Sequence, residues 1–233
     1  MSVSVPPWES LDMSGRAPRK APSLADQAYE ALKQWVVDGD LPAGVPLSEN
    51  DLARRFSISR SPLREAVRRL QDEGLLEPSG PRGFSVPPLS VELVRDVYGV
   101  RRALETAAAE TAVSIPPEEI VSMRARLDDQ VAQARQGDFA PFNENDFAFH
   151  DLFVANCGNR LLINSLDRLR GNLKRIINYA GQFEAHTLTS CEEHLAIMGA
   201  IESGSTAELR HTVDVHIRGV TERLVATFEA NQG

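Results

Sequence analysis

The sequence predicts a mainly α-helical protein in two parts: a small unit of short helices with a two-stranded wing, then an all-α, antiparallel six-helix bundle. Three observations support this fold class. From residue 90 onward, apolar side chains recur at helical spacing, without the alternation typical of strands. Before that point, apolar runs are short and are separated by turns rich in Gly, Pro and Ser. The length of 233 residues and the 42% hydrophobic content allow two ordinary cores.

The chain opens with a predicted tail and a first helix. Residues 1–22 are rich in Pro and Ser and carry three basic side chains near their end. We expect this tail to be disordered, because such a composition buries too little apolar surface to fold. The first helix is expected from Ser23 to about Val37, and the run 38–44, with its glycines and proline, stops it.

Residues 47–76 predict two further helices joined by a tight turn. Ser48 can cap the first of them, and Glu49 and Asp51 suit its N-terminal turn. The second begins near residues 59–62, where proline is tolerated because its missing N–H would be unpaired in any case. Its apolar residues recur at helical spacing, so one face is expected to pack on a core.

This pair of helices is unusually basic. Between Arg54 and Arg69 there are six arginines and one glutamate, a local charge of +5 in a chain of net charge −8. A basic block on a helix is a typical footprint for a phosphate backbone, although a solvated basic face is the alternative. Arg60, Ser61 and Arg64 lie near the start of the second helix, the part of a recognition helix that reads the major groove. The usual base target of an arginine there is guanine.

A wing is predicted after the recognition helix. Leu75–Leu76 and Phe84–Val86 are expected to form two short strands around a turn-rich tip. Arg82 and Gly83 lie at this tip, where a wing enters the minor groove. Residues 23–88 are therefore predicted to form a winged helix-turn-helix domain.

Several short pieces of this domain carry a family resemblance. They are Leu41-Pro42-Ala43-Gly44, Leu47-Ser48-Glu49, Leu52-Ala53, Ser59-Arg60-Ser61-Pro62-Leu63-Arg64-Glu65-Ala66, Leu70, Gly74-Leu75 and Arg82-Gly83. On these residues the domain resembles the DNA-binding domain of the GntR family of bacterial transcription regulators. The resemblance implies that Ser59, Arg60, Ser61 and Arg64 contact double-stranded operator DNA, with Arg82 and Gly83 at the wing tip. Asn50 stands where some relatives have a further DNA-contacting arginine, so that contact is not carried over.

The second half of the chain is predicted to be helical throughout. Six helices are expected at about residues 90–113, 116–136, 138–157, 159–180, 190–202 and 205–229. Asn159 is a candidate N-cap, and Ser205 with Glu208 forms a candidate capping box. Short loops join the helices, so we predict an antiparallel bundle over residues 89–229.

Four polar side chains of this bundle are expected to point into its apolar interior. Asp146 and His150 are four residues apart and share a helix face. His194 and His216 each lie in line with apolar residues of another helix. A single inward histidine is usually a hydrogen-bonded core residue, but three with an aspartate suit a divalent metal. We expect zinc first, with nickel and manganese as alternatives.

These residues also belong to a second resemblance. Its pieces are Val100-Arg101-Arg102-Ala103-Leu104-Glu105, residues 107–112, residues 146–150, Gly158-Asn159, Glu193-His194 with Ile197 and Ile201, and His216. On them, residues 89–229 resemble FCD, the all-helical ligand-binding domain of the FadR subfamily of GntR regulators. The family's metal ligands carry over onto Asp146, His150, His194 and His216. Six helices rather than seven point to the VanR-like branch, which implies a metal-containing regulator responding to a small organic acid.

The resemblance implies a homodimer on a palindromic operator, and we favour a repressor that its effector releases. Four protein ligands leave two positions of an octahedral metal for a carboxylate effector. Arg101 is the candidate for holding that effector or for offsetting Asp146, and an arginine in a surface salt bridge is the alternative. Two alternatives are a metalloenzyme fused to a DNA-binding module and a regulator whose histidines are structural and metal-free. The enzyme is disfavoured because Glu144, the nearby candidate base, lies on another face and no nucleophile motif is present.

Charge, cysteines and hydropathy limit the function further. Residues 1–88 carry 11 basic and 12 acidic side chains, and residues 89–233 carry 14 and 21, so the acidic second half is not expected to bind nucleic acid. No apolar run approaches the roughly 20 residues of a membrane span, and no signal peptide is visible. We therefore expect a cytoplasmic protein without a membrane partner. Cys157 and Cys191 are expected to be reduced core thiols, and His186 and His211 to lie on the surface.

Overall fold

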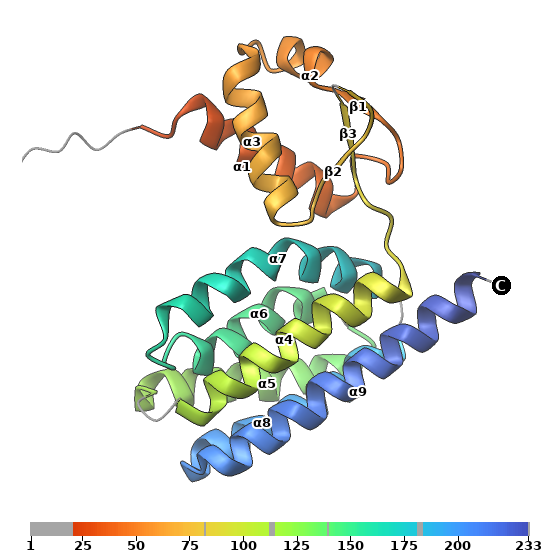
Figure 1. Cartoon of the computed structure of the whole chain (residues 1–233). Helices are drawn as coiled ribbons and strands as arrows, with labels where there is room; N and C mark the ends of the chain where they lie inside the picture. The colour runs from red at the N-terminus through yellow and green to blue at the C-terminus, as the bar shows by residue number, and fades with distance from the viewer. Residues whose placement is uncertain (1–20, 82, 112–114, 139, 181–183, 233) are drawn as a thin grey trace, which may run out of the picture.

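The computed structural model describes residues 21–81, 83–111, 115–138, 140–180 and 184–232, with only the backbone given for 140–144, 180, 184–186 and 231–232. Nearly all of the predicted tail lies outside these ranges, as does Arg82. Figure 1 shows a small N-terminal unit above a larger set of long helices. We call residues 21–87 the head and residues 91–232 the bundle.

The head contains three helices and a small sheet. Its elements are α1 (Leu24–Asp38), β1 (Leu47–Ser48), α2 (Glu49–Arg55), α3 (Arg60–Asp72), β2 (Glu77–Pro78) and β3 (Gly83–Ser85). α1 begins at a capping box between Ser23 and Asp26, and its C-cap is Gly39, whose φ of +82° suits a residue without a side chain. Leu32, Leu63 and their apolar neighbours are buried in one core between the helices and the sheet.

The wing differs in detail from the prediction. The three strands are antiparallel in the order β1-β3-β2, with Leu47 opposite Phe84 and Glu77 opposite Ser85. Leu75 and Leu76 were predicted as strand residues, but they precede β2 and are buried in the core of the head. β1 was not predicted, because a two-residue strand has no periodicity and becomes recognisable only through its pairing with β3.

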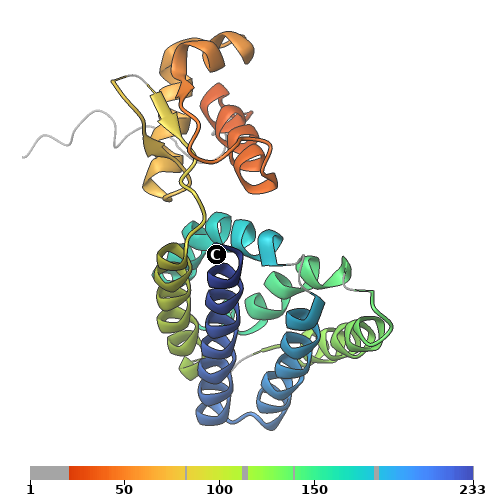
Figure 2. The same cartoon turned by 90° about the vertical axis from the view of Figure 1, so that its right-hand side faces the viewer.

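Within the described ranges, the bundle contains the six predicted helices. They are α4 (Val91–Thr111), α5 (Pro117–Ala134), α6 (Ala140–Val154), α7 (Arg160–Ala180), α8 (Glu184–Ser203) and α9 (Thr206–Gln232). α4 and α9 pack along each other, α9 also packs on α8, and α5 packs on α8. Figure 2 shows the helix ends fanned around a common interior, with α7 on the side facing the head. None of the helices in the described residues is both long and apolar enough to cross a bilayer.

Two helix boundaries differ from expectation. α6 ends at Val154 rather than Cys157, because the chain turns there and Gly158 takes a φ of +71°. α8 begins at Glu184, six residues before the predicted start. The predicted N-cap at Asn159 is present, since its side-chain oxygen accepts bonds from two backbone N–H groups at 3.1 and 3.2 Å. Ser205 caps α9 by accepting from the Glu208 N–H at 3.2 Å.

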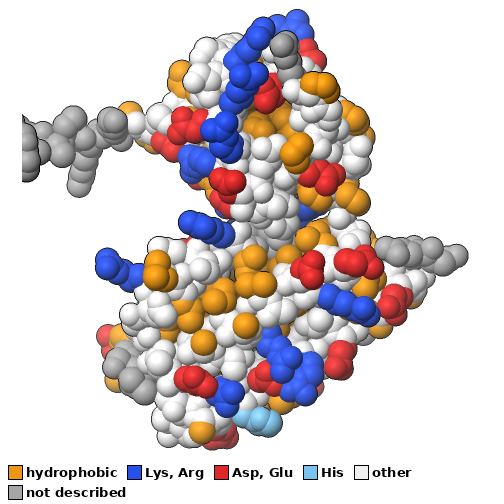
Figure 3. Space-filling view, viewed as in Figure 1, with side chains coloured by type: hydrophobic (Ala, Val, Ile, Leu, Met, Phe, Trp, Pro, Cys, Tyr) orange, Lys and Arg blue, Asp and Glu red, His pale blue; other side chains and the backbone are white. Residues whose placement is uncertain are grey.

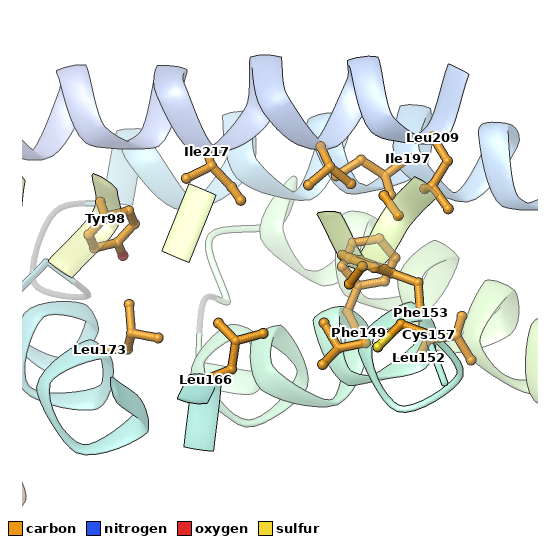
Figure 4. Close-up of a cluster of buried hydrophobic side chains, with 14 of the residues drawn as sticks. Tyr98, Phe149, Leu152, Phe153, Cys157, Leu166, Leu173, Ile197, Leu209 and Ile217 are labelled. Atoms are coloured by element: carbon orange, nitrogen blue, oxygen red, sulfur yellow. The ribbon is translucent and has the colours of Figure 1, made fainter. Parts of the chain in front are cut away.

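The bundle interior is an apolar cluster contributed by all six helices. In Figure 4, Phe149 and Phe153 of α6 point into the space that Ile197 of α8 and Leu209 of α9 also enter. Both cysteines are buried free thiols, as expected. The helices thus enclose a buried apolar region, and the polar groups inside it form the candidate site.

Candidate functional site

Three histidines from three helices meet inside the bundle. His150 of α6, His194 of α8 and His216 of α9 each offer a ring nitrogen, and these nitrogens all lie within 4.8 Å of one another. All three side chains are buried, and the ring centroids are 4.7 to 5.3 Å apart. Helical spacing had placed each on an inward face, and the packing of α6, α8 and α9 brings them together.

Asp146 lies beside these histidines, one turn before His150. Its Oδ1 is 3.6 Å from Nε2 of His194 and 3.9 Å from Nε2 of His150. The side chain is buried, with 4% of its surface exposed. The structure therefore groups all four residues that the sequence had proposed as metal ligands.

Two glutamates that the sequence reasoning did not assign orient two of the histidines. Nδ1 of His150 lies 2.6 Å from Oε2 of Glu105 on α4, and Nδ1 of His216 lies 2.7 Å from Oε2 of Glu193 on α8. A carboxylate on Nδ1 fixes the ring orientation and turns Nε2 inward, as behind metal-bound histidines in general. One signal was present: Glu105 follows Arg101 by four residues on the same helix face.

Each glutamate is itself paired with an arginine. Nε of Arg101 donates to Glu105 at 2.6 Å, and two nitrogens of Arg223 donate to Glu193 at 2.7 Å. Burial alone would raise the pKa of Glu105, but the charges of Arg101 and His150 hold it at about 2. Burial likewise opposes the charge on Glu193, and hydrogen bonds from His216 and Arg223 bring its pKa to about 2. Both glutamates are therefore anionic at neutral pH.

The charge and hydrogen bonding of this cluster fit a bound cation. Burial lowers the pKa of His194 and of His216, so both rings are neutral at pH 7, the form that binds metals. Oδ2 of Asp146 and Nε2 of His150 are buried and have no hydrogen-bond partner among the described residues. The nearest cation to that oxygen, on Arg101, is 3.7 Å away, too long for a hydrogen bond. A divalent metal would satisfy these atoms, and three imidazoles with one carboxylate suit zinc, nickel or manganese.

Arg101 is a buried residue rather than a surface one. Only 2% of it is exposed, and its guanidinium lies between Glu105 and Asp146. It also lines a small cavity with Phe147, Leu166 and other residues of α6 and α7. Its neighbour Arg102 is exposed and pairs with Asp214.

The predicted DNA-contacting residues lie at one end of α3. Ser59 is its N-cap residue, and Arg60, Ser61 and Arg64 are all exposed. Figure 3 shows a band of Lys and Arg side chains along the face of the head where α3 lies in Figure 1. Nε of Arg64 donates to Glu49 at 2.7 Å, and this bond anchors the side chain without using the two terminal nitrogens of the guanidinium.

Gly83 has a packing role that its place at the wing tip did not reveal. A Cβ atom at this position would lie 2.5 Å from the Ser79 carbonyl oxygen and 2.9 Å from that of Leu47. Only glycine allows β3 to approach both neighbouring segments so closely.

Some predicted residues lie outside what the structure describes. Arg82, the predicted partner of Gly83 at the wing tip, lies outside the described residues, and the side chains of Glu144 and His186 do too. His211 is exposed, as expected.

An arginine-rich helix on a winged head, joined to a helical bundle with buried ligand-type residues, is the arrangement of a DNA-binding protein with a second, helical domain. Comparison with known families agrees. Residues 24–86 match the family described as bacterial regulatory proteins, gntR family, and residues 96–219 match the FCD domain. The chain belongs to the GntR family of bacterial regulators and carries an FCD domain; it is a transcription regulator, not an enzyme.

Three curated relatives are transcription regulators that this chain matches over most of their length. The uncharacterized HTH-type regulator YdhC of Bacillus subtilis (strain 168) is 30% identical over 210 residues, covering 87% of this chain and 92% of YdhC. The repressor RspR of Escherichia coli (strain K12) is 26% identical, covering 84% and 86%. A probable repressor of the D-xylose utilization operon from Paenarthrobacter nicotinovorans is also 26% identical, covering 91% and 92%.

Solved structures share the fold. E. coli McbR/YncC has a TM-score of 0.69 at 20% identity, covering 91% of this chain and 99% of its own. A GntR regulator from Rhodococcus sp. RHA1 has a TM-score of 0.67 at 19% identity, covering 87% and 97%. The arrangement of a winged head on a helical bundle is therefore that of known regulators.

Replacement of Arg64 by alanine is expected to weaken operator binding and relax base preference at one half-site position by about 1–3 kcal/mol. The physical reason is the loss of a planar donor fork from the exposed start of α3. Arg126→Ala removes the same charge from an exposed position of α5 and should leave binding unchanged. Titration of both variants against a panel of single-base operator substitutions measures the effect. If Arg64→Ala binds every operator of the panel with the same affinity as the parent, another part of the head reads the DNA.

Proposed function

We propose that this protein is a homodimeric repressor that binds a palindromic operator and leaves it when a small carboxylate binds at a metal site in the FCD domain. The observation that carries the proposal is the buried cluster of Asp146, His150, His194 and His216. Two of its polar atoms lack hydrogen bonds among the described residues. Leaving such atoms buried and unsatisfied costs about 1–3 kcal/mol each, which a bound cation would offset.

The four residues would hold the metal, and Glu105 and Glu193 would orient His150 and His216 toward it. We expect zinc first, with nickel and manganese as alternatives, since imidazole with carboxylate suits all three. When bound, the metal would supply a positive centre in a dry interior, to which an anionic oxygen ligand is attracted. A small carboxylate is the simplest molecule with such an oxygen.

Arg101 is the protein residue best placed to accompany that ligand. Its guanidinium is buried and already balances Glu105 and Asp146. We propose that it offsets the acidic charge of the site and donates to the effector carboxylate, as arginines commonly do through their planar fork.

The dimer and the direction of the response follow from the DNA site and the relatives. A recognition helix from each of two subunits requires a two-fold symmetric operator. Two of the relatives are named as repressors, which supports release from DNA as the outcome of effector binding. We assign residues 1–22 to a tail, 23–88 to the DNA-binding domain and 89–229 to the effector domain, and place the protein in the cytoplasm with its operator.

Operator titration with and without a small organic acid tests the proposal. A thermal-shift screen of organic and sugar acids first identifies an acid that binds the metal-loaded protein. That acid is then expected to change operator affinity by a coupling of about 1–3 kcal/mol in the parent and to have little effect in His194→Ala. Equal operator affinity with and without a saturating, demonstrably bound acid would refute the coupling. A full response in His194→Ala would place the effector site elsewhere.

A further inference from the structure

One face of α7 holds the head through three polar side chains. Nδ2 of Asn172 donates to the Glu73 carbonyl oxygen at 2.9 Å, and a terminal nitrogen of Arg175 donates to that of Pro87 at 2.6 Å. Nδ2 of Asn178 donates to the Val37 carbonyl oxygen at 3.2 Å. Figure 1 shows α7 as the bundle helix that lies beneath α1 and α3. The donors thus come from one helix, and the acceptors come from three separate parts of the head and linker.

Two of these acceptors are ends of head helices. Glu73 is the C-cap of α3, the arginine-rich helix, and Val37 lies in the last turn of α1. The last carbonyls of a helix have no partner within the helix and carry the negative end of its dipole. Donors on α7 therefore bind the head where its backbone offers free acceptors. The third acceptor, Pro87, lies at the end of the head, in the short segment between β3 and α4.

The contact is close as well as polar. A Cβ atom on Gly171 of α7 would lie 2.6 Å from Cδ1 of Leu75, a residue fully buried in the head. Glycine at this position lets the α7 backbone approach the end of the head core. The close packing of Gly171 on Leu75 and the hydrogen bond from Asn172 to Glu73 therefore hold the same segment, residues 73–75, which follows directly from α3.

Arg175 makes this contact specific. It is buried, and among the described residues no carboxylate forms an ion pair with it; it donates to Pro87 and to Asn172. Burial accordingly lowers the pKa of its guanidinium. A buried cation with neutral partners is costly, and the cost rises if its carbonyl acceptors move away. One orientation of the head is therefore favoured over others.

The opposite side of α7 is tied to the candidate metal centre. Arg170 donates from two nitrogens to the carboxylate of Asp151, at 2.8 and 3.0 Å, and Asp151 follows His150 in α6. The cavity between α6 and α7 that His150, Asp151 and Arg170 line has a volume of about 20 Å³, room for roughly one water molecule. Little empty space therefore separates α6 from α7 around this ion pair.

We propose that this face of α7 is a docking surface for the head of the same chain, and that the Asp151–Arg170 pair connects it to the candidate metal centre. The docking surface comprises Gly171, Asn172, Arg175 and Asn178. It sets the orientation in which the bundle presents α3, independently of any ligand. The connection through Asp151 rests on the proposed function, because it concerns how effector binding reaches the head.

Spin-label distance measurements on the full chain test the docking surface without any effector. Labels at Glu30→Cys on α1 and Val121→Cys on α5 occupy exposed positions, while the native cysteines are buried. Diluting labelled with unlabelled protein isolates the distance within one chain. We expect a narrow distribution in the parent and a clearly broader one in Arg175→Met and in Asn172→Ala. Arg168→Met, an exposed position of the same helix, should keep the parent distribution.

Two variants are compared so that misfolding is not mistaken for loss of the docking contact. Arg175→Met removes a buried side chain, so its circular dichroism and melting must first match the parent; Asn172→Ala is the milder change. Equally narrow distributions in folded Arg175→Met and Asn172→Ala would overturn the docking surface. A broad distribution in the parent itself would overturn it too.

The connection is tested with Asp151→Asn, using Asp129→Asn on the exposed face of α5 as the matched control. Metal content and acid affinity should stay at the parent level, while the acid-induced change in operator affinity should fall by roughly 2- to 30-fold. A full response in Asp151→Asn would overturn the connection. If the parent itself binds acid without a response, the proposed function fails, and the distance measurements still decide the docking surface.

Discussion

Purified protein in which both His150 and His194 are replaced by alanine is expected to contain almost no divalent metal, whereas the parent contains about one ion per subunit. Two of the four ligand side chains are then missing, and Asp146 with His216 alone cannot form a closed site. Elemental analysis after exhaustive dialysis measures the content. His211→Ala is the matched control, because His211 is exposed on the same helix as His216. Stoichiometric metal in the double variant would refute the assignment.

The same measurement decides between the proposal and a purely structural histidine cluster. A metal-free parent that folds and binds its operator would favour the structural reading. If metal is present, its retention should depend on pH, because imidazole must be neutral to bind it and protons compete below about pH 6. Burial lowers the pKa of His194 and His216, so their loss of metal should occur at a lower pH than for an exposed histidine site.

Replacement of Arg101 by methionine is expected to destabilise the metal-stripped protein by about 3–5 kcal/mol, the usual effect of removing one partner of a buried ion pair. Methionine fills a similar volume, so the loss is mainly electrostatic. Glu105 would lose its ion pair with Arg101, and Asp146 would lose its nearest cation. Urea unfolding in the presence of a chelator measures the change. Arg102→Met, at the exposed neighbouring position paired with Asp214, should cost no more than about 1 kcal/mol.

The effect of Arg101→Met should depend on pH with a defined sign. The pKa of Glu105 is about 2 in the folded parent, below the roughly 4.3 of an unfolded glutamate. Its contribution to stability is therefore present above about pH 4.3 and is lost as the pH falls toward 2. The stability difference between parent and variant should thus be steady above about pH 4.3 and shrink as the pH falls from there toward 2; a difference that stays constant over that range would point to packing rather than charge.

The sequence alone determined the features that depend on local periodicity. Leu63, Ala66, Val67 and Leu70 recur at helical spacing and are all buried in α3, while Arg64 and Arg68 between them are exposed. The same reasoning placed Asp146, His150, His194 and His216 on inward faces, and all four are buried. The direction in which a helical residue faces is fixed by its spacing from apolar neighbours, and this information lies within a few turns of the chain.

Only the tertiary structure decided which of those faces meet. Glu105 and His150 are separated by 45 residues, and Glu193 and His216 by 23, so no local pattern could pair them. The strand β1 likewise exists only through its pairing with β3, and the contact of Asn172 with Glu73 joins residues 99 apart. Each of these contacts depends on the packing of whole helices, which is set by the sum of many weak apolar contacts across the core. Hydrogen bonds and charges between distant residues follow from that packing, and they are what turn three inward histidines into a candidate metal site.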